Sequence, residues 1–177
     1  MITLGEVYKE YQMPDRGGDK GTLHSYIDVY AEHISPRTKS LLEVGVFEGH
    51  SLMMWQTYLP DARVVGLDTN VRQCQFDVDV RQCNATIGWQ IIEALGEETF
   101  EVIIDDGSHR LHDQIATFDL LWPRLKKGGA YWIEDIAGTD ELTAIVRHLE
   151  RLGHEPDVWD LRTVKGRFDD ILVRVCR

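Results

Sequence analysis

The length and composition of the chain predict a single globular domain. It has 177 residues, of which 43% are hydrophobic and 28% are charged, enough to bury a sizeable core with little length left for further modules. Thirty acidic residues against 19 basic ones leave a formal net charge of −11. Because affinity for phosphate backbones comes mainly from Lys and Arg, this charge disfavours a nucleic-acid partner, although a basic patch on one face is not excluded.

The cysteines and the lack of long apolar segments predict a cytoplasmic protein. Cys74, Cys83 and Cys176 are odd in number and have no C-x-x-C spacing, which fits reduced thiols better than a disulfide scaffold or a zinc site. No stretch approaches the ~18 apolar residues of a membrane span, and no basic-then-apolar signal segment follows Met1. We therefore expect no membrane partner.

In chain order, the hydrophobic pattern predicts an α/β fold. A short helix over 1–13 and a glycine-rich loop over 13–21 precede a helix that Pro36 closes, so that residues 1–38 form an N-terminal helical and lid segment. Strands then alternate with helices; the strands are 40–46, 62–68, 78–83, 100–105 and 129–134, and the helices are 49–58, 87–96, 111–126 and 140–152. This alternation predicts one domain over 1–177 with a doubly wound, mostly parallel, seven-stranded Rossmann-like sheet.

Two segments depart from the regular alternation. The roughly nine residues between Asp68 and Val78 are fewer than the dozen or so that a helical crossover needs, so we expect a single helical turn there. The last twenty residues read as two strands joined by a tight turn, which predicts an antiparallel hairpin at the sheet edge. The tryptophans at 55, 89, 122 and 132 are expected in the core.

The segment L-L-E-V-G-V-F-E-G-H-S has the pattern of a strand that enters a ligand-binding turn. Gly45 permits the turn and Gly49 opens the next helix, but the spacing is not the G-x-G-x-x-G of dinucleotide sites. A ligand without phosphates, carrying a nucleoside and an amino acid, fits that difference. Asp68, at the tip of the next strand, can accept both ribose hydroxyls. The alternative is an ordinary strand-to-helix turn with a surface Asp.

Acidic residues end two later strands. Asp106 closes F-E-V-I-I-D-D, and Glu134 with Asp135 closes Y-W-I-E-D. The carboxyl ends of parallel strands meet at one rim, where clustered carboxylates repel one another unless a cation lies between them. Oxygen ligands alone select Mg²⁺, with Mn²⁺ or Ca²⁺ as replacements. The alternative for Asp105 and Asp106 is a solvated turn or a helix cap.

The segment L-L-E-V-G-V-F-E-G-H-S resembles the cofactor-binding segment of the class I S-adenosylmethionine-dependent methyltransferases. That family has E-x-G-x-x-x-G-x-S, which Glu43, Gly45, Gly49 and Ser51 match. The resemblance implies that Gly45 approaches the methionine moiety, that Ser51 contacts its carboxylate and that Asp68 holds the ribose.

The same resemblance implies adenine contacts from Asn84 and Ala85, although Asn84 stands where the family commonly has Asp. Asp105 is expected to shape its loop or to contact the cofactor.

The acidic strand ends resemble those of the metal-dependent O-methyltransferases. These include the catechol type and the macrocin and mycinamicin type, which methylates sugar hydroxyls of antibiotics. The shared motifs are D-D-G-S-H, W-I-E-D and the N-terminal G-G-D-K-G-T-L-H-S-Y. The resemblance implies a metal site made of Asp106, Glu134 and Asp135.

Several side chains near these motifs are candidates for proton transfer or for closing the site. His109 lies three residues after Asp106, and an unperturbed pKa near 6.5 would suit a general base at neutral pH, with His112 as the alternative. Lys20, together with Asp19, either folds over the cofactor or belongs to a flexible charged loop. His24 either lines the active site or caps a helix, and the cap is the favoured interpretation.

These motifs together predict a Mg²⁺-dependent O-methyltransferase for a small molecule with vicinal hydroxyls, such as a natural-product sugar. The competing functions are a dinucleotide-dependent oxidoreductase, a catalytically silent S-adenosylmethionine-binding module and, disfavoured by charge, a nucleic-acid methyltransferase. A homo-oligomer is compatible with so small a site.

Overall fold

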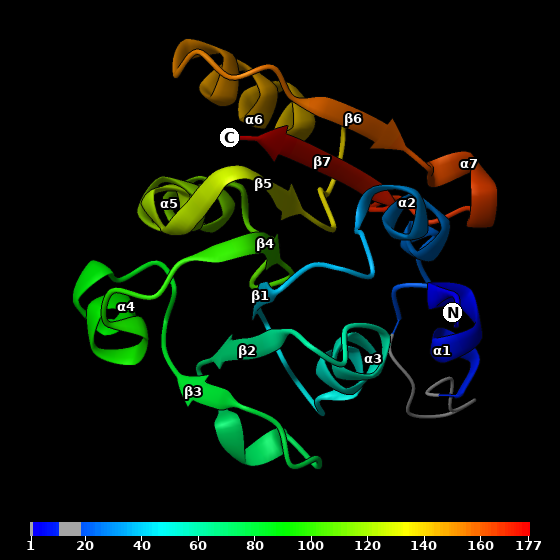
Figure 1. Ribbon diagram of the computed structural model, residues 1–177. Helices are drawn as coiled ribbons and strands as arrows, with labels where there is room; N and C mark the ends of the chain where they lie inside the picture. Colours follow the sequence, from blue (N-terminus) through cyan, green and yellow to red (C-terminus); the bar gives the residue numbers. More distant parts are fainter. Residues whose placement is uncertain (1, 11–18) are drawn as a thin grey trace.

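The computed structural model describes residues 2–10 and 19–177, in which seven strands form one mixed sheet (Figure 1). The strands are β1 (Ser40–Val44), β2 (Arg63–Asp68), β3 (Val80–Gln82), β4 (Phe100–Asp105), β5 (Leu125–Ile133), β6 (Asp157–Asp160) and β7 (Ile171–Cys176). Their order is β3-β2-β1-β4-β5-β7-β6. The first five are parallel, and β7 runs antiparallel to both β5 and β6. The predicted fold class is confirmed.

Helices cover both faces of the sheet (Figure 1). The helices and 3₁₀ turns are α1 (Leu4–Glu10), α2 (Tyr26–His33), α3 (His50–Tyr58), η1 (Val71–Gln73), α4 (Gly88–Leu95), α5 (Leu111–Leu121), η2 (Trp122–Arg124), α6 (Thr139–Arg151) and α7 (Arg162–Lys165). Apolar side chains of α4, α5 and α6 pack on one face, and those of α1, α2 and α3 pack on the other. The central strand β1, S-L-L-E-V, is buried at every residue, as expected for a parallel strand covered on both sides.

The predicted single turn between β2 and β3 is confirmed as η1. Two other predicted boundaries are wrong. The helix predicted over 111–126 ends at Leu121, because Pro123 supplies no N–H and the chain continues as a 3₁₀ turn. Strand β5 then starts at Leu125 rather than 129, and its pairing with β4 shifts register between Phe100 and Val102.

The predicted tight turn between the last two strands is also wrong. Strands β6 and β7 do pair antiparallel, with β6 at the edge, but the short helix α7 lies between them. Among the tryptophans expected in the core, Trp55 and Trp132 are fully buried, whereas Trp89 is 64% exposed on α4. Trp89 lies on the solvent-exposed side of an amphipathic helix. The spacing of apolar residues alone did not show which side of α4 is buried.

Residues 1 and 11–18, which include the ends of the predicted first helix and most of the predicted 13–21 loop, lie outside the described residues. In the described part of the chain, no helix combines the length and the apolar character required to cross a bilayer.

Candidate active site

A cavity of about 280 Å³ opens at the carboxyl ends of the parallel strands. Five residues predicted to bind a cofactor line it: Gly45, Asp68, Asn84, Ala85 and Asp105. Helix α5 also contributes to the lining of the cavity, through Asp113, Gln114 and Thr117. The remaining predicted cofactor residues, Lys20, Glu43, Gly49 and Ser51, are not part of the lining.

The turn after β1 requires glycine at its first position. Gly45 has φ +86°, and a Cβ there would lie 1.8 Å from the carbonyl oxygen of Asp106. The turns after β1 and β4 are thus in direct contact through their backbones. Gly49, with φ +92°, precedes the first residue of α3.

Asp68 holds this turn in place from the neighbouring strand. Its Oδ2 accepts hydrogen bonds from the backbone N–H of Val46 at 2.7 Å and of Phe47 at 3.0 Å, and its Oδ1 accepts one from Asn70 at 2.8 Å. Phe47 has a left-handed backbone, φ 49°, although it is not a glycine. The carboxylate predicted to hold a ribose therefore also organises the loop that would receive the rest of that ligand.

Beside the cavity, the buried ammonium of Lys20 is surrounded by three carboxylates. Its Nζ lies 2.5 Å from Asp106 Oδ2, 2.8 and 2.9 Å from the two oxygens of Glu134, and 3.1 Å from Glu43 Oε1. Lys20 is only 1% exposed, which contradicts the alternative of a flexible charged loop at this residue. Ser51 donates to Glu43 Oε1 at 2.7 Å, so both residues belong to the wall around Lys20.

This cluster sets the protonation of its members. Burial acts to lower the pKa of Lys20, but the charges of Asp106, Glu134 and Glu43 outweigh it and raise that pKa well above its usual range. Burial raises the pKa of Glu134 well above its ordinary value and also raises that of Glu43, and the charge of Asp106 adds to both shifts. One ammonium therefore does not balance all the negative charge that the strand ends bring together.

His109 lies between two of the predicted metal ligands. Its Nε2 is 3.2 Å from Asp106 Oδ1, and its Nδ1 is 3.5 Å from Asp135 Oδ2. His109 and Asp135 both adopt left-handed backbones, φ 57° and 54°, which is strained for residues with a side chain. His112 is instead exposed beside Asp113, away from these carboxylates. The geometry thus separates the two histidines that the sequence left as alternatives.

The expected unperturbed pKa of His109 is wrong for this arrangement. Burial alone would lower the pKa of His109, but the hydrogen bond to Asp106 and the charges of Asp106 and Asp135 outweigh burial and raise the pKa to about 9. This shift favours the protonated form of the His109 ring at neutral pH.

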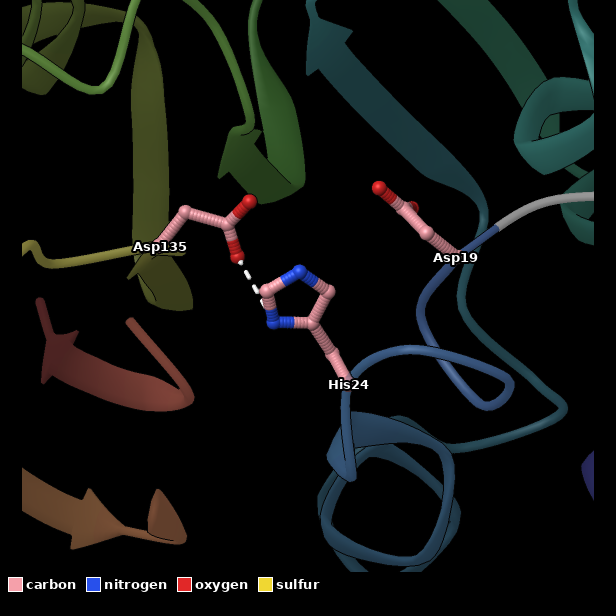
Figure 2. Close-up of side chains that lie close together, drawn as sticks. All are labelled: Asp19, His24 and Asp135. Carbon is pink, nitrogen blue, oxygen red and sulfur yellow. Dashed lines mark ion pairs between the residues drawn. The ribbon is translucent and has the colours of Figure 1, made fainter. Parts of the chain in front are cut away.

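His24 also approaches Asp135, and its ring points toward that carboxylate (Figure 2). Its Nδ1 lies 3.2 Å from Asp135 Oδ1, and the ring is 1% exposed. Asp19 faces the same space, and the three residues each offer one possible metal-ligand atom within 4.8 Å of the others. The favoured interpretation of His24 as a helix cap is wrong, since Ser25 holds the N-cap position of α2.

The three predicted metal ligands lie near one another but do not all belong to one cluster. Asp106 shares one possible ligand cluster with His109 and Asp135 and another with Glu43 and Glu134, and no such cluster of the described residues holds Asp106, Glu134 and Asp135 together. The donor set still fits a hard divalent cation, because it is made of carboxylate oxygens whose charges are incompletely balanced. Burial and the charge of Asp106 raise the pKa of Asp135 as well.

Two tyrosines of the site were not predicted. Tyr30 donates to Glu134 Oε1 at 2.6 Å, and Tyr26 donates to Asp135 Oδ1 at 2.8 Å. Both lie on the buried face of α2, four residues apart, and this spacing is typical of ordinary core residues in a helix. The Y in the H-S-Y motif was the one available signal.

Comparison with known proteins confirms the resemblance. No protein-family model matches the chain. It is 30% identical, over 68% of its length, to an 8-demethyl-8-α-L-rhamnosyl tetracenomycin-C 2′-O-methyltransferase of Streptomyces olivaceus, covering 35% of that protein. It is also 30% identical, over 75% of its length, to a mycinamicin VI 2″-O-methyltransferase of Micromonospora griseorubida, covering 36% of that protein. The chain thus spans about a third of the length of these relatives.

Solved structures show the same fold. The MycE methyltransferase of mycinamycin biosynthesis, determined in complex with Mg and SAH, superposes with a TM-score of 0.72 at 22% identity, over 99% of this chain and 54% of that one. An O-methyltransferase from Bacillus cereus in complex with SAH gives 0.62 at 16% identity, over 98% and 90% of the two chains. The fold is that of class I methyltransferases. The relatives of this chain are O-methyltransferases of sugar hydroxyls.

Proposed function

We propose that this chain is the catalytic domain of an S-adenosylmethionine- and Mg²⁺-dependent O-methyltransferase that acts on a small hydroxylated molecule. One observation carries the proposal: a cavity of about 280 Å³ lies directly beside a buried carboxylate cluster at the same rim of the sheet. Asp105 lines the cavity and Asp106 belongs to the cluster, so consecutive residues join the two sites. The relatives support a sugar as acceptor, and a vicinal diol is the finer form of the proposal.

In this proposal the cavity receives the nucleoside. Asp68 accepts from the ribose hydroxyls, and Asn84 and Ala85 flank the adenine. Gly45 lets the methionine portion lie against the backbone. Glu43, Gly49, Ser51 and Lys20 act by shaping this turn and its surroundings rather than by lining the cavity.

Asp106, Glu134 and Asp135 would hold the cation, Mg²⁺ by ligand type with Mn²⁺ or Ca²⁺ as replacements. When bound, such a cation chelates acceptor oxygens and lowers the pKa of a hydroxyl. Tyr26 and Tyr30 orient two of these carboxylates through their hydroxyl groups. Both carboxylate oxygens of Glu134 also accept hydrogen bonds from the Lys20 ammonium, and these bonds fix the position of the Glu134 side chain.

In the proposed reaction, His109 accepts the proton of the acceptor hydroxyl. It is the histidine that touches both Asp106 and Asp135. The negative charges of Asp106 and Asp135 raise the pKa of His109, so the ring becomes a base only when those charges are offset. We propose that His109, rather than His112, carries the proton.

The test uses binding, because it needs no knowledge of the acceptor. Calorimetry of the wild-type chain should detect S-adenosylhomocysteine but not NAD⁺, and Mg²⁺ should raise the melting temperature. Asp135→Asn should lose the Mg²⁺-dependent rise while retaining S-adenosylhomocysteine affinity within about tenfold, a change of ~1.4 kcal/mol or less. Asp157→Asn, a surface carboxylate paired with Arg174, is the matched control and should behave as wild type.

Each competing function has its own result in this experiment. Binding of NAD⁺ in place of S-adenosylhomocysteine would identify an oxidoreductase. Binding of S-adenosylhomocysteine with no response to Mg²⁺ would identify a silent cofactor-binding module. The cytoplasmic location, the single domain over 1–177 and the oligomeric state stay predictions.

A further inference from the structure

The side chain of Gln114 leaves one polar atom unsatisfied inside the rim cavity. Gln114 is 2% exposed and lines the cavity from the first half of α5. Its Nε2 donates to the backbone carbonyl of Glu134 at 2.9 Å. Its Oε1 is buried and has no hydrogen-bond partner. Leaving a buried acceptor unpaired is costly, so such an atom beside a cavity indicates a missing donor.

The orientation of this amide is fixed by chemistry. The carbonyl of Glu134 can only accept a hydrogen bond, so the NH₂ group of Gln114 must face it. The carbonyl oxygen of the side chain is therefore the atom that remains for the cavity. It can accept from an N–H or O–H, and it rejects a ligand that offers only lone pairs at that point.

The position of Gln114 selects one part of a nucleoside ligand. Helices α4 and α5 are on the same face of the sheet, and Asn84, Ala85 and Thr86 line the cavity from the loop that leads into α4. Asn84 and Ala85 are the residues expected beside the adenine. Gln114 borders the same cavity from α5, whereas Ser51, which the resemblance assigns to the methionine carboxylate, does not line it.

We infer that the Gln114 side-chain carbonyl accepts a hydrogen bond from the exocyclic amine of the cofactor's adenine. This inference rests on the proposed function, because it requires an adenine nucleoside in the cavity. The exocyclic amine is the N–H donor that an adenine ring carries. Gln114 thereby distinguishes a 6-aminopurine from other purines and, through its bond to Glu134, joins the base-binding wall to the strand end that carries the acidic cluster.

The experiment compares two ligands that differ in this amine alone. S-Adenosylhomocysteine is titrated by calorimetry beside its 6-deamino analogue, in which hydrogen replaces the exocyclic amine while ribose, ammonium and carboxylate are unchanged. Wild type should bind S-adenosylhomocysteine at least about fivefold more tightly, the effect of one hydrogen bond. Gln114→Met keeps the length of the side chain without its amide, and should reduce that ratio to below about twofold. The exposed Gln73→Met is the control and should keep the wild-type ratio.

The outcomes separate the inference from the function on which it rests. If wild type does not bind S-adenosylhomocysteine, the proposed function and the inference both fail. If it binds, but the ratio of affinities is close to one or is unchanged in Gln114→Met, the inference alone is overturned. If Gln114→Met does not fold, a crystal structure of wild type with S-adenosylhomocysteine decides: Oε1 must lie within about 3.2 Å of the exocyclic nitrogen.

Discussion

At the scale of single residues, Lys20 is the cation on which the acidic rim depends. Its Nζ lies within 3.1 Å of Glu43, Asp106 and Glu134, and the side chain is 1% exposed. A buried ion pair adds little net stability as a whole, but removing one partner leaves the others unpaired in a medium that solvates them poorly. Loss of the Lys20 ammonium should therefore lower the stability of the whole domain.

Lys20→Met should lower the free energy of unfolding by about 3 kcal/mol or more, because three carboxylates lose their shared counter-charge. Urea unfolding followed by circular dichroism measures this. Lys39→Met is the control: its ion pair with Asp61 is exposed, so it should cost less than about 1 kcal/mol. Equal effects of the two substitutions would contradict the importance assigned to Lys20.

Asp105 gives the domain a pH-dependent loss of stability. Burial raises the pKa of Asp105 to about 7, whereas an Asp of the unfolded chain titrates near ~3.9. Between about pH 4 and pH 7 the native state holds a proton that the unfolded chain has released, so this residue lowers the free energy of unfolding as pH rises through that window.

Asp105→Asn should remove this loss. The stability of the variant relative to wild type should increase from about pH 4 to about pH 7 and then level off, as urea unfolding at a series of pH values would show. Asn retains the oxygen that accepts from the Gly107 N–H. The exposed Asp61→Asn is the control. A difference between Asp105→Asn and wild type that is constant across the window would show that Asp105 is ionised in the native state.

At the scale of elements, the site depends on how closely the turns after β1 and β4 approach one another. The carbonyl of Asp106 occupies the position that a Cβ on Gly45 would need. Asp106 N–H in turn donates to Val44 O at 2.9 Å, so a backbone hydrogen bond next to that contact also joins the two turns. Moving either turn would move the cavity and the first residue of the acidic cluster together.

Gly45→Ala should therefore destabilise the domain more than a left-handed backbone alone explains. Gly128→Ala supplies the comparison, since Gly128 has φ +82° and open space around it and should cost only ~1–2 kcal/mol for its conformation. We expect Gly45→Ala to exceed that cost by at least about 1 kcal/mol, from overpacking against backbone. The measurement is thermal or urea unfolding of both variants. Similar losses of stability would contradict the close contact between the turns after β1 and β4.

At the scale of the whole molecule, the net charge of −11 opposes binding to nucleic acids. Nonspecific affinity for a phosphate backbone requires Lys and Arg in excess, and here most of the basic side chains described are paired with nearby carboxylates or backbone carbonyls. We therefore predict that the chain does not bind nucleic acid.

An electrophoretic assay at low salt should show no complex with a short single-stranded RNA at protein concentrations up to about 10 µM, a concentration at which an ordinary nonspecific binder forms a complex. A basic protein of similar size is the positive control. Salt-sensitive RNA binding in the micromolar range would favour the nucleic-acid methyltransferase alternative.

The architecture and the strand ends that carry the site could be predicted from local patterns in the amino-acid sequence. Apolar runs alternating with helical patterns are local signals, so the succession of strands and helices along the chain and the position of Asp68, Asp106 and Glu134 at strand ends follow from them. Boundaries after α5 and between β6 and β7 were wrong, because a single proline and a four-residue helix changed them.

Which side chains contact one another could not be predicted from the sequence and depends on the folded chain. The bond of Lys20 to Glu134 spans 114 positions, and that of Tyr26 to Asp135 spans 109. No local pattern encodes a contact between an N-terminal segment and a strand so far along the chain. The same holds for the amide of Gln114 and the pKa of His109, which depend on burial and on charges that folding brings together. Periodicity reports which face of an element is covered, whereas protonation and hydrogen-bond partners are properties of the packed rim.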